Sequence, residues 1–572
     1  MIRKRIHSRG VGGIRRREFL RAVPAGVAAG MWPRALGAAQ GTSPPTAEHL
    51  RLAGELAGLE FGDSELGLMR GAVDDNGERY EELRAFAIPH DTEPAIAFHP
   101  YLPGERPTGS ATPHAPLSIP RPEAPAVPDS LGALAFEPVS VLATLVARRD
   151  ITPTDLTRMY LDRLRRYGDR LACVVTLTED LAIAQAAEAD REIGAGRYRG
   201  PLHGIPWGAK DLFATRGVRT TWGAKPYEHQ ILDTDATVVQ RLQDAGAVLV
   251  AKLSMGALAQ GGVWFGGSTR NPWDVSRSSS GSSAGPAAAT AAGLVGFSVG
   301  TETLGSIIAP SAACGVTGLR PTYGRVSRHG AMALCWTMDK IGPMCRSVED
   351  CALVFNAIYG SDGHDGAVVD APFEWTEVFD TTRLRVGYIA AEFEELPAGQ
   401  QVALRRALDV LRDTGVPLEP VELPEFPADA LRLILNVEAA AAFDDLTRSR
   451  GVDQLTQQGP NDWPNLFRSS RLVPAVEYIR AQRARTLLIR DMHSLMRRYD
   501  AFLSPSRSRS LTITNLTGHP AVAVKAGFSE GLPVALMITG RLYDEARLLR
   551  LAALYERATE WNGMHPPAFA RA

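Results

Sequence analysis

Serine and glycine are concentrated between Arg270 and Ser311, in a stretch that also carries apolar residues. Two runs stand out: Ser278-Ser279-Ser280-Gly281-Ser282-Ser283-Ala284-Gly285 and Gly300-Thr301-Glu302-Thr303-Leu304-Gly305-Ser306-Ile307. A serine hydroxyl is a weak nucleophile at neutral pH and needs an adjacent base to take its proton as it attacks. The two runs therefore favour acyl transfer by a serine, if the fold brings a base to one of them.

Two other interpretations of this stretch have to be weighed. A flexible linker would have polar flanks, whereas Trp273, an alanine-rich segment and the apolar run 294–299 lie within or beside these runs. The run 281–285 also fits the G-x-S-x-G nucleophile elbow, with Ser283 as nucleophile. An elbow requires a strand directly before the serine, and the proline, aspartate and serines of 270–280 do not favour one.

The same stretch resembles the amidase signature, whose usual form is G-G-S-S-G-G, an alanine-rich helix and then G-T-D-x-G-G-S-I. Further segments are similar to other blocks of that family in the same order, and together they extend over about residues 130–565. These segments are Leu202–Asp211, Cys314–Thr322, Trp336–Met344 and Asn515–Ala521.

The resemblance implies three catalytic residues and no metal or organic cofactor. Ser306 matches the nucleophile, Ser282 the bridging serine that follows a cis peptide bond, and Lys210 the base. Lys210 would act only when neutral, so burial or positive neighbours must lower a pKa that is about 10.4 in water. Ser282 would give its proton to Lys210 while it accepts one from Ser306, and the relay would later protonate the leaving amine.

The resemblance also places an oxyanion hole and supporting groups. The backbone N–H groups of Thr303, Leu304, Gly305 and Ser306 are expected to stabilise the oxyanion at the start of a helix. Ser283 and Thr301 are expected to support the loop by hydrogen bonding rather than to attack.

Several positions depart from the family pattern. Glu302 replaces the usual aspartate, and Leu304 replaces a glycine, which puts the loop in question because leucine tolerates a positive φ poorly. Ile308 stands where many members have arginine. With Trp264 and Phe265 in a stretch that often faces the substrate, Ile308 predicts an apolar substrate pocket.

The predicted function is hydrolysis of a carboxylic amide to an acid plus ammonia or an amine, through an acyl-enzyme on Ser306. The substrate is expected to be a small apolar amide. An esterase or carbamate hydrolase with the same triad remains an alternative. The A subunit of a tRNA-dependent amidotransferase is disfavoured by the predicted export, and a non-catalytic homologue by the complete triad.

Helix and strand patterns alternate along most of the chain. Helices are expected at 153–166, 179–193 with Thr178 as cap, 235–245, 348–358, 476–498 and from Asp544 as cap to 558, and strands at 247–251, 294–299, 385–389, 521–524 and 534–538. This alternation predicts an α/β fold, a large mixed sheet covered by helices on both faces. Residues 130–572 are expected to form the catalytic domain, after a helical extension and proline-rich connection at 40–129.

The N-terminus resembles a twin-arginine signal peptide. Basic residues precede Arg16-Arg17-Glu18-Phe19-Leu20-Arg21, and a short apolar stretch ends at small residues near Ala39. Residues 1–39 are therefore expected to direct export to the periplasm or the exterior. The apolar stretch is too short to cross a bilayer.

The composition excludes several classes of function. A net charge of −2 over 572 residues gives no electrostatic footprint for nucleic acid. The five cysteines form no C-x-x-C pair, so we expect buried thiols rather than a disulfide framework or a zinc site. A small-molecule amide is the expected partner, without stable membrane insertion, and a homodimer is left open.

Overall fold

A computed structural model of the chain describes residues 45–56, 62, 63, 66, 67, 70, 90, 98–100, 117, 125–375, 379–471 and 473–570. The chain forms two compact units, 1–86 and 87–572. In the first unit the structure describes helix α2 (Ala47–Leu56), inside the predicted helical extension. The predicted signal peptide at 1–39 lies outside the described residues, and the boundary near residue 130 stays a prediction.

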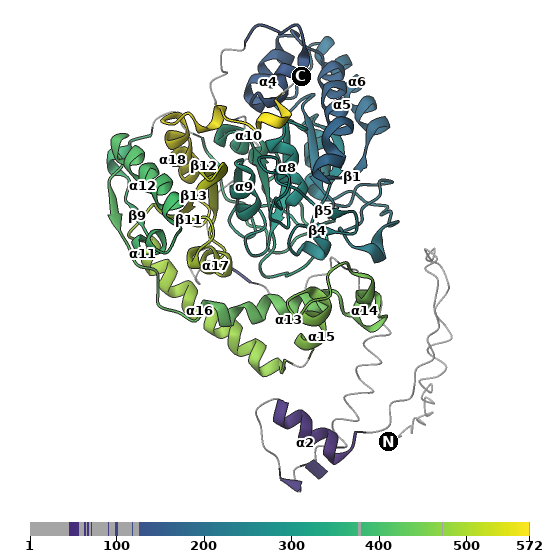
Figure 1. Cartoon of the computed structure of the whole chain (residues 1–572), viewed down its shortest axis with the longest axis vertical. Helices are drawn as coiled ribbons and strands as arrows, with labels where there is room; N and C mark the ends of the chain where they lie inside the picture. Colours follow the sequence, from purple (N-terminus) through teal and green to yellow (C-terminus); the bar gives the residue numbers. More distant parts are fainter. Residues whose placement is uncertain are drawn as a thin grey trace, which may run out of the picture. The chain divides into compact units, whose positions relative to one another are not determined.

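An eleven-stranded sheet forms the centre of the second unit (Figure 1). Its strand order is β1-β3-β2-β6-β8-β7-β12-β13-β11-β9-β10. The strands are β1 (Val174–Leu177), β2 (Pro206–Lys210), β3 (Val248–Leu253), β6 (Phe297–Glu302), β7 (Thr317–Arg320), β8 (Lys340–Cys345), β9 (Val386–Tyr388), β10 (Leu418–Pro420), β11 (Ala501–Pro505), β12 (Ala521–Ser529) and β13 (Leu532–Gly540). A separate two-stranded sheet pairs β4 (Val263–Trp264) with β5 (Gly267–Ser268).

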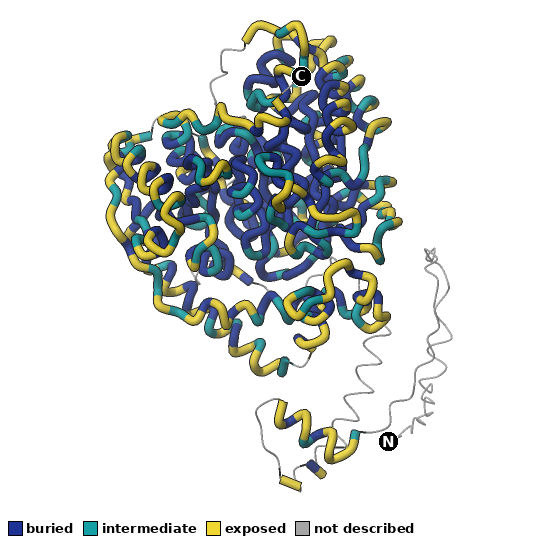
Figure 2. Tube along the Cα trace, viewed as in Figure 1, coloured by how far each residue is buried: buried dark blue, intermediate teal, exposed yellow. Residues whose placement is uncertain are grey.

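The large sheet is mixed, as predicted. β2 runs parallel to β3 and β6, and β9 runs parallel to β10 and β11, whereas the remaining neighbours are antiparallel. Every residue of β2, β3, β6 and β8 is buried, which requires cover on both faces. Figure 2 shows this buried centre surrounded by more exposed outer helices.

Helices come from most of the second unit. They are α4 (Val139–Ala147), α5 (Pro153–Leu171), α6 (Glu179–Gly194), α7 (Thr237–Asp244), α8 (Ala284–Ala291), α9 (Ile308–Cys314), α10 (Val348–Ile358), α11 (Ala390–Glu394), α12 (Ala398–Asp413), α13 (Arg432–Ala442), α14 (Asp444–Arg448), α15 (Trp463–Ser470), α16 (Ala475–Met496), α17 (Arg509–Leu516) and α18 (Glu545–Arg557). Helices α5 to α12 and α18 pack on strands of the sheet, whereas α13 packs against α15 and α16. In Figure 1, α5 and α6 lie near β1, and α11 and α12 lie near β9 at the other end of the sheet.

The predicted elements are present, with some shifted ends, and both predicted cap residues stand at the N-cap positions without capping through their side chains. α10 has its predicted bounds, whereas the strand expected at 294–299 is β6 and starts three residues later. Thr178 and Asp544 precede α6 and α18 but make no capping hydrogen bond. The Thr178 hydroxyl instead donates to the Leu249 carbonyl on β3, so it joins the helix to the sheet.

The prediction of buried thiols is confirmed, because all five cysteines are free and buried. Of the helices in the described residues, none has the combined length and apolar character needed to span a bilayer.

Candidate functional site

The predicted base and the predicted bridging serine meet at the carboxyl ends of two parallel strands. Lys210 is the last residue of β2, and Thr301 lies at the end of the neighbouring β6. Ser282 and Ser283 come from the loop that leads into α8, which packs on both strands. Ligand and active sites of α/β sheets commonly lie at such strand ends.

Four oxygen atoms lie within hydrogen-bonding distance of the Lys210 nitrogen. This ammonium nitrogen lies 2.8 Å from the Ser282 Oγ, 3.1 Å from the Ser283 Oγ, 2.9 Å from the Thr301 Oγ1 and 3.4 Å from the Thr301 carbonyl oxygen. The side chain is fully buried. Burial lowers the Lys210 pKa to about 7, although Asp339 and Glu302 act in the opposite direction. A neutral lysine is therefore accessible near pH 7, and a neutral lysine can accept a proton.

Ser283 and Thr301 support this arrangement rather than offer a free hydroxyl. The Ser283 Oγ donates to the Thr301 carbonyl at 3.0 Å and accepts from the Thr301 N–H at 3.2 Å. No strand directly precedes Ser283, so the structure lacks the strand that a nucleophile elbow needs. Their role in catalysis stays a prediction.

The loop of Ser282 is shaped by close backbone contacts. The Gly281–Ser282 peptide bond is cis, and a Cβ built on Gly281 would lie 1.8 Å from the Gly261 carbonyl oxygen. Only glycine fits at this position. The Ser283 N–H donates to the Ser306 carbonyl oxygen at 3.2 Å, which joins the two serine-containing loops directly.

Ser306 lies in the turn between β6 and α9 and is buried except for 9% of its surface. Gly305 adopts a φ of +92°, whereas Leu304 has no positive φ. The strain expected from leucine at position 304 is therefore absent, because the neighbouring glycine takes the unusual conformation. The N–H groups of Leu304, Gly305 and Ser306 make no hydrogen bond within the described residues.

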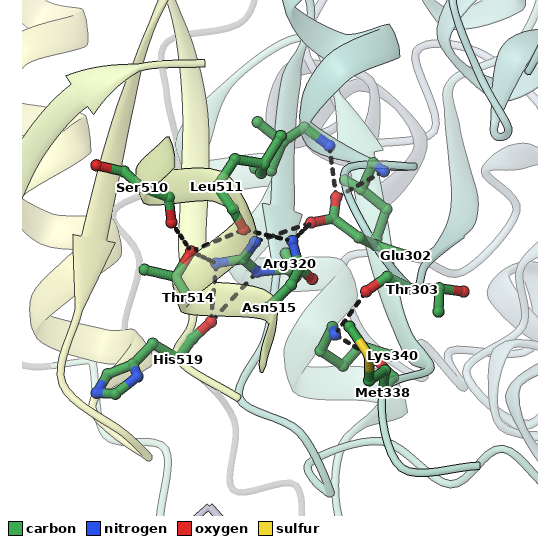
Figure 3. A network of polar contacts seen from close by, with 12 residues as sticks. Glu302, Thr303, Arg320, Met338, Lys340, Ser510, Leu511, Thr514, Asn515 and His519 are labelled. Atoms are coloured by element: carbon green, nitrogen blue, oxygen red, sulfur yellow. Dashed lines mark hydrogen bonds and ion pairs between the residues drawn. The ribbon is translucent and has the colours of Figure 1, made fainter. Parts of the chain in front are cut away.

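The Glu302 carboxylate holds the turn that carries Ser306 through four hydrogen bonds (Figure 3). One carboxylate oxygen accepts the N–H groups of Ile307 and Ile308, both at 2.8 Å, and the other accepts from Arg320 and Asn515, both at 2.8 Å. The first N–H groups of α9 are thus held by Glu302. Burial alone would raise the Glu302 pKa, but Arg320 and Lys340 outweigh it and the pKa is lowered, so the carboxylate stays charged.

Asp339 and Lys340 hold the other end of the turn. The Thr303 hydroxyl donates to Asp339 at 2.6 Å. The Lys340 ammonium donates to the carbonyl oxygens of Thr303, at 3.4 Å, and Met338 (Figure 3). Burial, and then Arg320, lower the Lys340 pKa to about 7. Sequence reasoning gave these residues no role, although 339 and 340 lie in the block 336–344 that resembles the family.

A buried ion pair begins at the residue that follows Lys210 in the sequence. Asp211 and Lys252 are 3.4 Å apart and both side chains are fully buried. Asp211 also accepts the N–H of Thr221 at 2.9 Å, and Lys252 donates to the Phe213 carbonyl at 2.7 Å. This pair fixes the turn after β2 and so the direction in which the strand presents Lys210.

The residues predicted to line a substrate pocket have other neighbours. Ile308 is fully buried in a cluster with Ala521, Ala523 and Met537. Trp264 is buried and donates to the Ala172 carbonyl at 3.1 Å, while the ring of Phe265 packs edge-on against it. Their contact with a substrate stays a prediction.

A narrow cavity does reach the Lys210 site. Thr301, Thr303, Asp339 and Lys340 form part of its wall, and Arg328 and Asp365 form an ion pair in another part. The remaining wall is mostly apolar and includes Leu212, Ala331, Met332, Leu334, Trp336 and Ile341. The described residues contain no group of three or more His, Cys, Asp or Glu side chains that could hold a metal.

Comparison with known proteins identifies the family. The model of the family described as Amidase matches residues 155–512. The chain belongs to the amidase family. The peptide amidase from Stenotrophomonas maltophilia, a solved structure, matches with a TM-score of 0.66 and 33% identity, covering 74% of this chain and 97% of that chain.

Curated relatives within the amidase family carry another name. The A subunit of glutamyl-tRNA(Gln) amidotransferase from Roseiflexus sp. (strain RS-1) is 36% identical over 471 residues, which are 73% of this chain and 96% of that protein. The protein of the same name from Chloroflexus aurantiacus is 38% identical over 476 residues, 75% of this chain and 98% of the relative. The family is thus shown by sequence and by fold, and it contains both kinds of relative.

Proposed function

We propose that the protein hydrolyses carboxylic amides through an acyl-enzyme on Ser306. The observation that carries this proposal is the 2.8 Å hydrogen bond between the buried Lys210 ammonium nitrogen and the Ser282 hydroxyl. A lysine whose pKa is lowered to about 7 is neutral often enough to act as a base at physiological pH.

The proton path in this proposal runs through Ser282. As the Ser306 oxygen bonds to the amide carbon, its proton passes to Ser282, and the Ser282 proton passes to Lys210. The N–H groups of Thr303, Leu304, Gly305 and Ser306 stabilise the oxyanion. The relay then returns a proton to the nitrogen as the C–N bond breaks, so that ammonia or an amine leaves. Water enters, gives up a proton along the same path and releases the acid from Ser306.

The substrate in this proposal is small and mainly apolar. Half of the residues that line the cavity beside Thr301 and Thr303 are apolar, among them Met332, Trp336 and Ile341, and this apolar half favours an apolar acyl group. Esters and carbamates would meet the same machinery, because acyl transfer to serine does not require a nitrogen leaving group.

The experiment is active-site labelling of the purified chain with a fluorophosphonate probe, followed by mass spectrometry of the adduct. We expect the adduct on Ser306, and strongly reduced labelling in Lys210→Met and Ser282→Ala. Lys225→Met is the matched control, because Lys225 is exposed and forms its ion pair with the nearby Glu228, away from Lys210 and Ser282. An adduct on Ser283, or full labelling without Lys210, would overturn the proposed mechanism.

The relatives favour a second candidate, the A subunit of a glutamyl-tRNA(Gln) amidotransferase. The chain spans at least 96% of the length of the two relatives that carry this name. The two functions differ in their substrate, since the amidotransferase would release ammonia from an amide donor for transfer to glutamyl-tRNA. A screen of aryl, alkyl and amino acid amides by the isolated chain separates them. Turnover of glutamine alone, raised by glutamyl-tRNA and partner proteins, would favour the second candidate.

Export is part of the first proposal and speaks against the second. The basic segment and the Arg16-Arg17 pair support it. Replacing both arginines by lysine should retain the chain inside the cell, measured by fractionation. An unchanged distribution would count against a twin-arginine signal.

A further inference from the structure

A second cavity, of about 450 Å³, lies apart from Lys210, Ser282 and Ser306. Its wall comes from the segment 132–138, from the end of α9 at Cys314 and Gly315, and from the C-terminal segment 562–566. Three basic side chains also line it: Arg346, Lys525 and His565.

Lys525 is the most enclosed of these cations. It lies on β12, only 7% exposed, and its ammonium nitrogen donates to the carbonyl oxygens of Trp561 at 3.0 Å and Met564 at 2.7 Å. The ring of Trp273 lies 5.5 Å away. An ammonium group has three donors, and no carboxylate of the described residues forms an ion pair with Lys525. One donor therefore remains for a ligand in the cavity.

Two arginines add positive charge near this cavity: Arg346 lines it, and Arg163 lies next to Phe136 in its wall. Arg346 donates to the Val295 carbonyl at 2.8 Å and to the Glu137 carbonyl at 2.9 Å. Arg163, 6% exposed, donates to the Gly293 and Phe569 carbonyls at 2.7 and 2.8 Å. Within the described part of the chain neither guanidinium is paired with a carboxylate. Buried cations are usually paired, so this grouping is unusual.

The ring of His565 lies among these charges. It stacks on Phe136 at 4.1 Å, and the Arg163 guanidinium lies 5.3 Å from the same Phe136 ring. Burial lowers the His565 pKa, and Lys525, Arg163 and Arg346 lower it further, against a backbone hydrogen bond that raises it. Within the described residues, no carboxylate forms an ion pair with Lys525, Arg163 or Arg346.

The nearby acids are mostly engaged elsewhere. Asp350 accepts the N–H groups of Val139 and Ser140, at 2.9 and 3.1 Å, and Glu556 accepts the Val348 N–H at 3.0 Å. Burial raises the Glu556 pKa to about 8, so this group is largely neutral at pH 7. Glu137 alone among the acids lines the cavity.

The rest of the wall is largely apolar. It includes the side chains of Phe136, Pro138, Trp273, Val316, Met564 and Pro566. A ligand that is complementary to both the basic and the apolar part of the wall would place an anionic group near the cations and an apolar body against the aromatic rings of Phe136 and Trp273.

We propose that this cavity is a second ligand site, which binds a small carboxylate with an apolar body. The carboxylate accepts a hydrogen bond from Lys525 and lies in the field of Arg346 and Arg163, while the body packs against Trp273. A volume of about 450 Å³ suffices for an aryl or alkyl acid of this kind. The proposal does not depend on the catalytic role of Ser306.

The experiment is calorimetric titration of the full chain with 3-phenylpropionate, and with 3-phenyl-1-propanol as the neutral analogue. We expect the acid to bind and the alcohol to bind much more weakly. Lys525→Met should weaken binding about tenfold or more, as expected for a lost hydrogen bond to a charged group. Lys225→Met, on an exposed segment, should leave binding unchanged.

Two further variants locate the ligand. Ala133→Trp fills the cavity from an exposed position on its wall and should also abolish binding, which keeps the test valid if Lys525→Met fails to fold. Lys210→Met should bind normally. Absence of binding, equal binding of the alcohol, or loss of binding only in Lys210→Met would overturn the proposal.

Discussion

The Lys210 ammonium nitrogen lies 2.8 Å from the Ser282 hydroxyl oxygen, although the two residues are 72 positions apart in the chain. Lys210 ends β2 and Ser282 precedes α8, which packs on β2. The contact is therefore set by sheet and helix packing, and a change confined to either side chain tests the chemistry without removing the scaffold.

Lys210→Met should reduce kcat/KM by about 10²- to 10⁴-fold, the usual loss when a general base is removed. Methionine retains the apolar stem and removes the nitrogen that contacts Ser282, Ser283 and Thr301. The measurement is steady-state hydrolysis of an aryl amide, with thermal unfolding as a check on folding. Lys225→Met should keep normal rates. Activity within a few-fold of the parent chain would remove Lys210 from the mechanism.

The rate should fall as the pH is lowered through about 7. The Lys210 pKa is lowered to about 7 by burial, so the neutral form predominates above that pH and the protonated form below it. Because only the neutral form accepts a proton, kcat/KM should rise with pH and level off above about 8.

A second lysine has to be separated from this titration, since the Lys340 pKa is also lowered to about 7. A profile measured from about pH 5 to about pH 9 on Lys340→Gln distinguishes the two. We expect the acid limb to persist in this variant at a similar midpoint. Its disappearance would assign the limb to Lys340.

Gly305→Ala should lower kcat more than it lowers stability. Gly305 has a φ of +92°, and an added Cβ would lie 3.1 Å from the Leu511 Cδ2. The strain, more than about 1 kcal/mol, should displace the N–H groups proposed for the oxyanion hole. Gly531→Ala is a matched control, because Gly531 has a φ of +77° with no atom within 4 Å of the added Cβ.

Leu304→Gly gives the complementary test in the same turn. Leu304 has no positive φ, so glycine relieves no strain there and kcat should change only a few-fold. A large gain in kcat would mean that leucine at this position does distort the turn.

The sequence predicted the helices and strands better than the hydrogen bonds that join one element to another. Periodicity located α16, which buries one face, and α10, which is buried on most sides between the sheet and other helices. It could not show that Thr178 bonds to β3 instead of capping α6, because that choice depends on a strand 71 residues away. Hydrophobic periodicity depends on residues within one helix. A hydrogen bond between a helix and a strand that is distant in sequence forms only when the two elements pack together.

The same limit applies to the candidate site. The resemblance named Lys210, Ser282 and Ser306, and the structure places the first two in contact. The bonds from Glu302 to Arg320 and Asn515 cross 18 and 213 positions of sequence, and no spacing rule predicts the second of them. The resemblance marked Glu302 only as a departure from the family's aspartate.

Glu302→Gln should destabilise the protein by roughly 3–5 kcal/mol, the loss expected when one partner of a buried ion pair is removed. Arg320 and Glu302 are both fully buried, and the pair is 2.8 Å apart. The neutral amide would leave the Arg320 charge without its partner and would weaken the hold on the Ile307 and Ile308 N–H groups. Denaturant unfolding measures the loss, and kcat should fall with it because those N–H groups fix the Ser306 turn.

Glu477→Gln, on the exposed side of α16, is the control and should change stability by about 0.5 kcal/mol or less. In the double variant with Arg320→Met, the charge left behind in Glu302→Gln is removed as well. The loss should then be smaller than the sum of the two single losses. Strict additivity would show that the two side chains act independently, and that Glu302 holds the turn without help from Arg320.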